Sequence, residues 1–431
     1  MKFSFDEIKA NKINLLYLIS LIAVAVITFY FAIQSNSAGN FYEFDPYMYM
    51  EITRILAIHG SIPITGLAYP CGASCSSNRF GVIVPYWLAG YKLAMPSVPL
   101  YQIANLYPPI MLIIMALLLY ALFNTKPAKA TAVILLLSMP VVFQQFTGGM
   151  FQEEAIGFLS VIAVFVATYF ALSKRELAYS VFLGVIFLGS LLGSKYFTVT
   201  GTILPAILGL YVIYLFAIKN KEELKHSIKV QSILLAFALI GNISLLAYHG
   251  GFALVGFTLH GFFIPFNLLA LAVIYALSLL FYYSIGEGKL NKRHLEIGVA
   301  VIIILLLVFA GKIIKVINYL ASYQHIQNTI PLFRTVQEFL PYQSELPLLG
   351  IVLGNIASVV LVLITLAIVL IAEIYYKYKR KESILLEIML IATVYPLAYV
   401  GFGVGKYVAD LGLVLVLAIA YLVDKLFEVV M

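Results

Sequence analysis

Runs of about 20 apolar residues recur along nearly the whole chain, and this feature restricts the fold more than any other. Helices of that length cross a hydrocarbon layer of roughly 30 Å, and they satisfy every backbone hydrogen bond inside lipid. Only 11% of the 431 residues are charged, far below the level of about 25% found in soluble domains. The sequence therefore predicts an all-α polytopic membrane protein, with one transmembrane domain over residues 1–431.

We expect about 12 transmembrane helices, within a range of 11–13. The first apolar run is too long for the core of a signal peptide and precedes no small-residue cleavage pattern, so it is expected to remain as a span. Two longer segments, 34–100 and 319–348, separate spans. The predicted spans are 13–33, 101–123, 129–146, 154–172, 177–194, 197–218, 228–248, 264–285, 295–317, 349–375, 383–401 and 406–427.

The distribution of basic residues predicts the orientation of these spans. Nineteen of the 27 Lys and Arg residues fall in alternate loops, which by the positive-inside rule face the cytoplasm. Both termini are then cytoplasmic, the two longer segments are outer loops, and the plasma membrane is the expected location. This topology accounts for the net charge of +7 without a nucleic acid partner. Because Met431 follows the last span almost at once, no C-terminal soluble domain is expected.

The stretch Asn40 to Pro63 is the first candidate for a functional site. Asp45 precedes Pro46, which predicts a helix that begins there with an aspartate cap and a proline at its first helical position. An apolar stripe should follow at helical spacing, with Glu51 and Arg54 pointing away from it. Two readings stay open: an amphipathic helix in the membrane interface, or a helix that presents Asp45 as a catalytic carboxylate. The predicted stripe consists of Met48, Ile52, Ile55 and Leu56.

Cys71 and Cys75 are the only cysteines, and both fall in the first outer loop. An oxidising exterior would permit a disulfide across CGASC. A free pair or half of a metal site is the alternative, but two further ligands are not found nearby in the sequence.

Four further groups of polar residues fall near the outer ends of predicted spans. Each group also has a simpler explanation. The acids Glu153 and Glu154 complement a helix dipole, and Lys195 extends to the membrane interface. Arg334 and Glu338 are solvated loop residues, and Lys406 pairs with Asp410. The groups are Gln152, Glu153 and Glu154; Lys195; Arg334 and Glu338; and Lys406.

All five groups fall on the outer face in the predicted topology, so one shared cavity is expected. The carboxylates of Asp45, Glu154 and Glu338 suit Mg²⁺ or Mn²⁺, and the basic side chains could hold a phosphate. Transfer of a phosphate-linked sugar needs this combination, because the cations offset charge on the departing phosphate while a carboxylate orients the acceptor. The candidate phosphate-binding residues are Lys195, Arg334 and Lys406.

Five motifs in this order resemble the membrane portion of the oligosaccharyltransferase catalytic subunit, a GT-C glycosyltransferase of protein glycosylation. They are FDPYMYMEITRILAIHGSIP, NLYPPIMLIIMALLLYAL with its Pro108–Pro109 pair, GGMFQEEAIGF, TVQE and GKYVADLGLVLVLAIAYL. The resemblance implies that Asp45 is the catalytic carboxylate and a metal ligand, that Glu154 with Glu153 completes the metal site, and that Glu338 works with Asp45 on the acceptor. Lys406 would meet the donor phosphate.

The chain departs from that family at three places. Gln152 stands where the family has the first acid of its second motif, and Lys406 stands where it has an arginine, which removes a bidentate contact to phosphate. The tryptophan-rich motif that reads the acceptor is missing, and Trp87 is the only tryptophan. We therefore expect either a partner protein that supplies acceptor recognition or an acceptor other than an asparagine sequon.

The sequence predicts a metal-dependent glycosyltransferase that moves a sugar or oligosaccharide from a polyprenyl-phosphate or pyrophosphate carrier, such as a dolichol-linked donor, to a protein, lipid or glycan acceptor on the outer face. Two alternatives remain. One is a transporter or lipid flippase, although no internal repeat is found. The other is an inactive scaffold with the same fold, which Gln152 makes credible.

Overall fold

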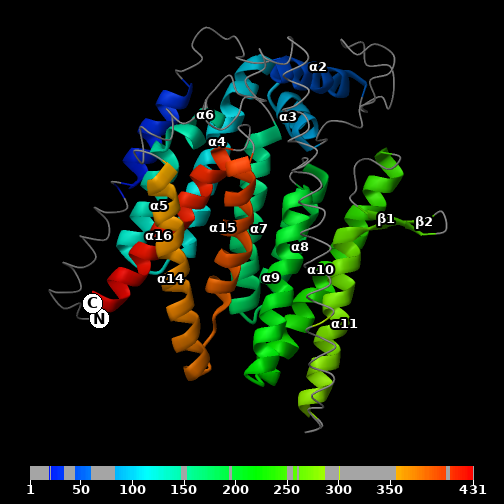
Figure 1. Cartoon of the computed structure of the whole chain (residues 1–431). Helices are drawn as coiled ribbons and strands as arrows, with labels where there is room; N and C mark the ends of the chain where they lie inside the picture. The colour runs from blue at the N-terminus through cyan, green and yellow to red at the C-terminus, as the bar shows by residue number, and fades with distance from the viewer. Residues whose placement is uncertain are drawn as a thin grey trace, which may run out of the picture.

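A computed structural model of the full chain describes residues 19, 21–33, 44–59, 83–146, 153–193, 197–249, 256–259, 262–286, 300, 356–403 and 408–430. Within these residues the protein is a bundle of long helices, with two shorter helices across one end (Figure 1). The shorter pair is α2 (Phe44–His59) and α3 (Ile83–Ala94). The bundle contains α4 (Leu100–Leu122), α5 (Lys126–Ser138), α6 (Pro140–Gln145), α7 (Glu153–Ser173), α8 (Leu177–Gly193), α9 (Phe197–Ala217), α10 (Lys221–His249), α11 (Phe266–Gly286), α14 (Ile356–Arg380), α15 (Leu385–Gly403) and α16 (Val408–Val430).

Six helices of the described part are long and apolar enough to cross a membrane. Three shorter apolar helices accompany them, at Leu21–Ile33, Leu177–Leu191 and Leu385–Ala398. The helical architecture confirms the predicted helical fold class and agrees with an integral membrane protein, whereas the count of 12 spans stays a prediction. Of the predicted span 295–317, the structure describes residue 300 alone. The six helices are Leu100–Leu122, Ala155–Ser173, Thr200–Ala217, Lys221–Ser244, Asn267–Ile285 and Val359–Arg380.

Pro140 divides one predicted span into two helices. The sequence analysis expected a continuous helix over 129–146, but α5 ends at Ser138 and α6 begins at Pro140. Met139 between them is extended, with φ −71° and ψ 115°. The proline ring disfavours helical backbone at the residue before it, which explains the break. In α4, by contrast, Pro108 and Pro109 stay inside a continuous helix and are both buried.

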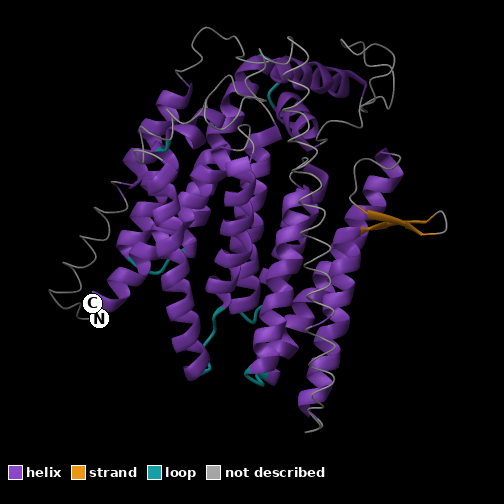
Figure 2. Ribbon diagram, viewed as in Figure 1, coloured by secondary structure: helices purple, strands orange, loops and turns teal. Residues whose placement is uncertain are grey.

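A two-stranded hairpin precedes α11 and corrects the all-α prediction locally. Strand β1 (Gly256–Leu259) pairs antiparallel with β2 (Phe262–Pro265), with Phe257 opposite Ile264 and Thr258 opposite Phe263. Figure 2 shows it projecting from the side of the helical bundle. Aromatic and β-branched residues fit a pleated strand better than a helix, which explains this local preference. The predicted span 264–285 therefore begins as helix only at Phe266.

Glycine allows α8 and α10 to approach closely. A Cβ built on Gly184 would lie 2.2 Å from Cδ2 of Phe237, and one on Gly241 would lie 2.9 Å from Cδ1 of Leu191. Because lipid offers no hydrophobic gain for helix pairing, close van der Waals contact between backbones is a main source of stability. This packing fixes the second half of α8 against α10 around Phe237 and Gly241.

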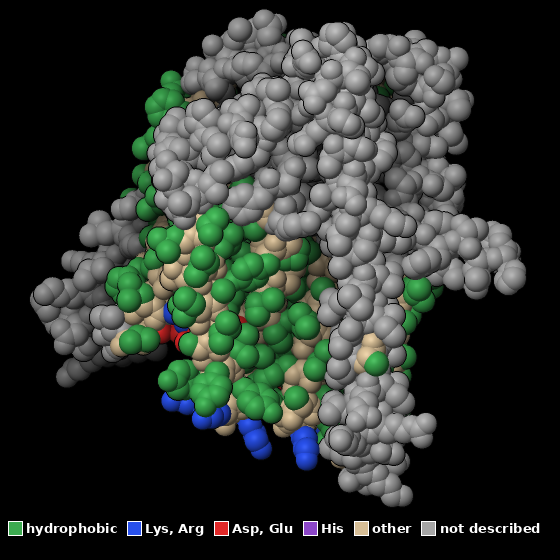
Figure 3. Space-filling view, in the orientation of Figure 1, with side chains coloured by type: hydrophobic (Ala, Val, Ile, Leu, Met, Phe, Trp, Pro, Cys, Tyr) green, Lys and Arg blue, Asp and Glu red, His purple; other side chains and the backbone are tan. Residues whose placement is uncertain are grey.

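Four turns gather at one end of the bundle, which we call the basic end: residues 123–125, 174–176, 218–220 and 381–384. Lys and Arg side chains lie along this end in the space-filling view, at the bottom of Figure 3. The starts of α4 and α7, together with α2 and α3, lie at the other end, which we call the opposite end (Figure 1). The predicted orientation places the basic end in the cytoplasm.

Candidate functional site

Helix α2 carries Asp45 at the opposite end of the bundle. The helix begins at Phe44, so Asp45 is its second residue and not the cap that the sequence analysis expected. Ile52 and Leu56 are buried, at 3% and 5% exposure, in contact with the main core cluster. The predicted apolar stripe is therefore confirmed at these two positions, and it fixes α2 against α3 and α4. The Asp45 side chain lies outside the described set.

Glu51 and Arg54 point away from the buried stripe of α2, as predicted. Arg54 donates from Nη2 to Oε1 of Glu51 at 2.6 Å and from Nε to Oε2 at 2.8 Å. The hydrogen bond from Arg54 holds the pKa of the Glu51 carboxyl below its ordinary value. Both side chains are exposed, so this pair marks the solvent-facing side of α2. Since each group satisfies the other, the pair is a structural feature of the helix surface.

Helix α7 begins with the acidic pair Glu153 and Glu154. These are its first two residues, where a negative charge complements the unpaired N–H groups of the helix start. The rest of the first turn is anchored, because Ala155 and Ile156 are buried. Nearby, the ring of Phe158 lies 6.1 Å from that of Phe146, the residue directly after α6. The side chains of both glutamates lie outside the described set.

The remaining predicted site residues fall outside the described residues: Lys195, Arg334, Glu338, Lys406, Cys71, Cys75 and Gln152. Two of them are bracketed by helices that the structure does describe. Lys195 lies between the end of α8 and the start of α9, and Lys406 lies between the end of α15 and the start of α16. The convergence of these side chains, the disulfide and the metal site stay predictions. Among the described side chains, no group of three or more His, Cys, Asp or Glu residues could hold a metal ion.

A second polar region, which the sequence analysis missed, occupies the basic end. Glu387 is fully buried near the start of α15, and its Oε1 accepts hydrogen bonds from Nζ of Lys377 at 2.7 Å and from Oη of Tyr421 at 2.9 Å. Its Oε2 is buried and makes no hydrogen bond within the part of the chain that the structure describes. This carboxylate joins α14, α15 and α16. The signal was present in the sequence as an acid inside the apolar run LLEIMLI.

A second buried acid, Asp424, joins α16 to α5. Its Oδ1 accepts from the backbone N–H of Thr125 at 2.9 Å and from the hydroxyl of Thr125 at 2.6 Å. Thr125 is the N-cap of α5, and its hydroxyl oxygen accepts from the backbone N–H of Ala128. Asp424 is 1% exposed, so these hydrogen bonds replace the water that it gives up on folding. The interaction connects residues 299 positions apart in the chain.

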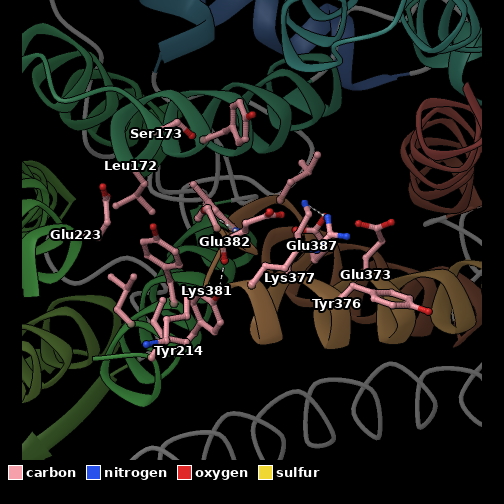
Figure 4. A pocket seen from close by; sticks show the side chains of 18 of the residues that line it. Leu172, Ser173, Tyr214, Glu223, Glu373, Tyr376, Lys377, Lys381, Glu382 and Glu387 are labelled. Carbon is pink, nitrogen blue, oxygen red and sulfur yellow. Dashed lines mark hydrogen bonds and ion pairs between the residues drawn. The ribbon is translucent and has the colours of Figure 1, made fainter. Parts of the chain in front are cut away.

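A pocket of about 930 Å³ opens beside these two acids. Side chains from α7, α9, α14 and α15 surround it, among them Tyr214, Glu373 and Lys377 (Figure 4). On one wall, Nζ of Lys425 lies 2.7 Å from Oε2 of Glu428 and 3.7 Å from Oε2 of Glu373. The basic end therefore holds a polar cavity that is separate from the predicted site at the opposite end.

Comparison with known proteins finds the fold only among solved structures. No protein-family model and no curated protein matches the sequence. The archaeal oligosaccharyltransferase AglB from Archaeoglobus fulgidus, in complex with an inhibitory peptide and a dolichol-phosphate, superposes with a TM-score of 0.61 at 16% identity. The match covers 95% of this chain and 51% of that one. The chain thus spans about half the length of the structures it matches.

Two further structures of the same oligosaccharyltransferase agree. The complex with Zn and sulfate gives a TM-score of 0.61, and the form tethered to an acceptor peptide containing the NVT sequon gives 0.58, both at 16% identity and 94% of this chain. The resemblance predicted from the five motifs is therefore confirmed at the level of the fold. The chain therefore shares the fold of about half of that oligosaccharyltransferase.

Proposed function

We propose that the chain is a membrane glycosyltransferase that transfers a sugar or oligosaccharide from a polyprenyl-phosphate or pyrophosphate carrier to an acceptor at the opposite end of the bundle. One observation carries the proposal: 95% of the chain shares the fold of an oligosaccharyltransferase that has been solved with a dolichol-phosphate and with peptides. The order of the five motifs supports it independently, because they were identified without the structure.

The site that we propose uses carboxylates from separate elements at that end. Asp45 in α2 and Glu338 orient the acceptor. The amide or hydroxyl of the acceptor is a weak nucleophile at neutral pH, so an enzyme carboxylate must contact it and accept its hydrogen bond. Lys406, with Lys195 and Arg334, stabilises the negative charge that develops on the departing phosphate. Each role is assigned by position in the motifs and is open to test by substitution.

A divalent cation fits the residues that we assign to it. Asp45 belongs to α2 and Glu153 and Glu154 begin α7, so the backbone places all three at the opposite end, and carboxylate oxygen is the donor that Mn²⁺ and Mg²⁺ prefer. A cation bound there would offset charge on the departing phosphate. The related structure with Zn and sulfate lends support to metal use in this fold.

The test is a transfer assay with the purified chain in lipid vesicles, a lipid-linked sugar donor and a set of acceptors. We expect chelation to stop transfer and Mn²⁺ or Mg²⁺ to restore it. Asp45→Asn should lower the rate by about a hundredfold or more, as loss of a general base does. Glu51→Gln is the matched control on the same helix, and it should leave the rate unchanged because Glu51 pairs with Arg54 on the exposed side. Full activity in Asp45→Asn would overturn the assignment.

The acceptor and any partner protein are tested in the same assay. We propose that acceptor recognition needs a partner protein, or that the acceptor is a hydroxyl, a lipid or a glycan. Efficient transfer by the purified chain alone to a peptide carrying Asn-x-Thr would contradict both versions.

The orientation has its own test. Single cysteines introduced by Lys225→Cys and Lys379→Cys should react only with reagent on the cytoplasmic side, and Arg79→Cys and Gln343→Cys only from outside. The opposite labelling pattern at Gln343 would remove Glu338 from the proposed site.

A further inference from the structure

The pocket at the basic end contains a buried carboxylate oxygen that has no hydrogen-bond partner among the described residues. Glu387 is fully buried, and only its Oε1 is used, by Lys377 and Tyr421. Its Oε2 is also buried and accepts nothing. Leaving such an oxygen unpaired costs free energy, and native proteins rarely tolerate this without a reason. Glu387 lines the pocket, so a small rotation of its side chain would let a ligand that carries an N–H or O–H donor reach this atom.

The charge around the pocket favours a cation as that ligand. Among the described residues, four cationic side chains line it, namely Lys377, Arg380, Lys381 and Lys425. Arg175 pairs with Glu223, which leaves five carboxylates against four cations, so one positive charge would improve the balance. The six carboxylates that line the pocket are Glu223, Glu373, Glu382, Glu387, Asp424 and Glu428.

The rest of the lining narrows the class of cation. Tyr169, Tyr211, Tyr214 and Tyr376 also line the pocket, and aromatic faces attract organic cations. The described acids form no group that could hold a metal ion. A volume of about 930 Å³ also exceeds what a bare ion needs and lies in the range of small-molecule sites.

We propose that this pocket binds a primary ammonium group, with Oε2 of Glu387 accepting one of its hydrogen bonds. The group could belong to a soluble aliphatic amine or to the headgroup of an aminophospholipid, since the chemistry at Glu387 is the same for both. A primary ammonium has three N–H donors, whereas a quaternary ammonium has none, so only the former can satisfy Oε2. The site lies at the basic end, and the proposal does not depend on the glycosyltransferase activity.

The test uses the full chain in nanodiscs of phosphatidylcholine, whose quaternary headgroup offers no N–H. In one arm, spermidine is titrated and binding is measured by calorimetry. In the other, phosphatidylethanolamine is added to the discs and the lipid retained on the protein is counted by native mass spectrometry. Saturable binding in the first arm assigns a soluble amine, and retention of phosphatidylethanolamine over phosphatidylcholine in the second assigns a lipid. Absence of both would overturn the proposal.

Substitutions connect the binding to this pocket. Glu387→Gln should weaken it by about tenfold or more, because a charge-assisted hydrogen bond is lost. Glu373→Gln, on a more exposed wall of the pocket, should weaken the binding by about threefold. This variant replaces Glu387→Gln in the test if Glu387→Gln does not fold. Glu222→Gln is the matched control: it is exposed, lies next to Glu223 and does not line the pocket. Equal binding in wild type, Glu387→Gln and Glu373→Gln, or equal binding of a fully N-methylated amine, would show that Oε2 is not the acceptor.

Discussion

The two ends of the bundle use charged residues in different ways. At the basic end, Glu387 and Asp424 are buried, and each accepts hydrogen bonds from other helices or turns. At the opposite end, the described charged pair of α2, Glu51 with Arg54, is exposed and connects residues of one helical turn. Buried charges join α5, α14, α15 and α16 to one another, whereas α2 is fixed by apolar contacts. We infer that polar interactions stabilise the basic end, whereas apolar contacts hold α2 at the opposite end.

The largest expected effect comes from breaking the buried ion pair of the basic end. Glu387→Leu leaves Lys377, which is only 22% exposed, without its partner. An unpaired charge in such a place destabilises a protein by about 3–5 kcal/mol. Thermal unfolding followed by the fluorescence of Trp87, the single tryptophan, would measure the loss. The double variant Lys377→Met/Glu387→Leu should recover most of it, since apolar replacement of a buried pair is often neutral. A single variant as stable as wild type would contradict a structural role for the pair.

A smaller effect is expected from the apolar contacts of α2. Leu56 is 5% exposed, so Leu56→Ala removes buried methyl groups and should cost about 2–3 kcal/mol. Because α2 also carries Asp45, displacement of this helix should lower sugar transfer more than it lowers stability. Ile58→Ala on the same helix is the control, since Ile58 is 62% exposed and should have little effect on either. Equal losses from the two variants would mean that α2 does not pack as described.

How far the sequence predicts the fold and the candidate site depends on the kind of signal. Apolar runs predicted α4 and α7 to within a residue or two, because length and hydrophobicity alone decide whether a helix crosses a membrane. The break at Pro140 was missed because it follows from a local rule, namely that a proline disfavours helical backbone at the residue before it. The hydropathy pattern carries no sign of this rule. The hairpin of β1 and β2 was missed for a similar reason, since a short aromatic stretch gives no periodic signal.

The site at the basic end was missed for a different reason. Lys377 and Lys425 were counted as markers of the cytoplasmic side, which treats a lysine as a charge and not as a hydrogen-bond donor. Glu387 and Asp424 lie 37 positions apart, and only the packing of α15 and α16 brings both acids to one pocket. The site acids of the opposite end were predicted because each belongs to a sequence motif, and their roles stay predictions.

A moderate effect is expected where Asp424 accepts from Thr125. Thr125→Val removes the hydroxyl that both donates to Asp424 and caps α5, while the backbone N–H keeps its contact. Loss of a cap and one hydrogen bond to a charged group should cost about 1–2 kcal/mol. Thr365→Val is the control, because the hydroxyl of exposed Thr365 bonds only the carbonyl of Leu361 in its own helix. A loss at Thr125 no greater than at Thr365 would show that α16 does not depend on this contact.

The smallest expected effect lies in the turn that follows α9. Lys219 has φ 58°, which lies in the left-handed region that favours glycine. Two hydrogen bonds close the end of α9: the N–H of Lys219 donates to the carbonyl of Phe216, and the N–H of Asn220 donates to the carbonyl of Leu215. Lys219→Gly relieves the backbone and should raise stability by about 0.5–1 kcal/mol. Loss of the lysine offsets part of this gain, because its positive charge stabilises the negative C-terminal end of α9 by a few tenths of a kcal/mol. Lys225→Gly, in the interior of α10, should instead destabilise the protein, as glycine does within a helix. If the unfolding midpoint falls for both Lys219→Gly and Lys225→Gly, the charge of Lys219 outweighs the backbone strain in this turn. The lysines would then stabilise the basic end more than its helix termini do.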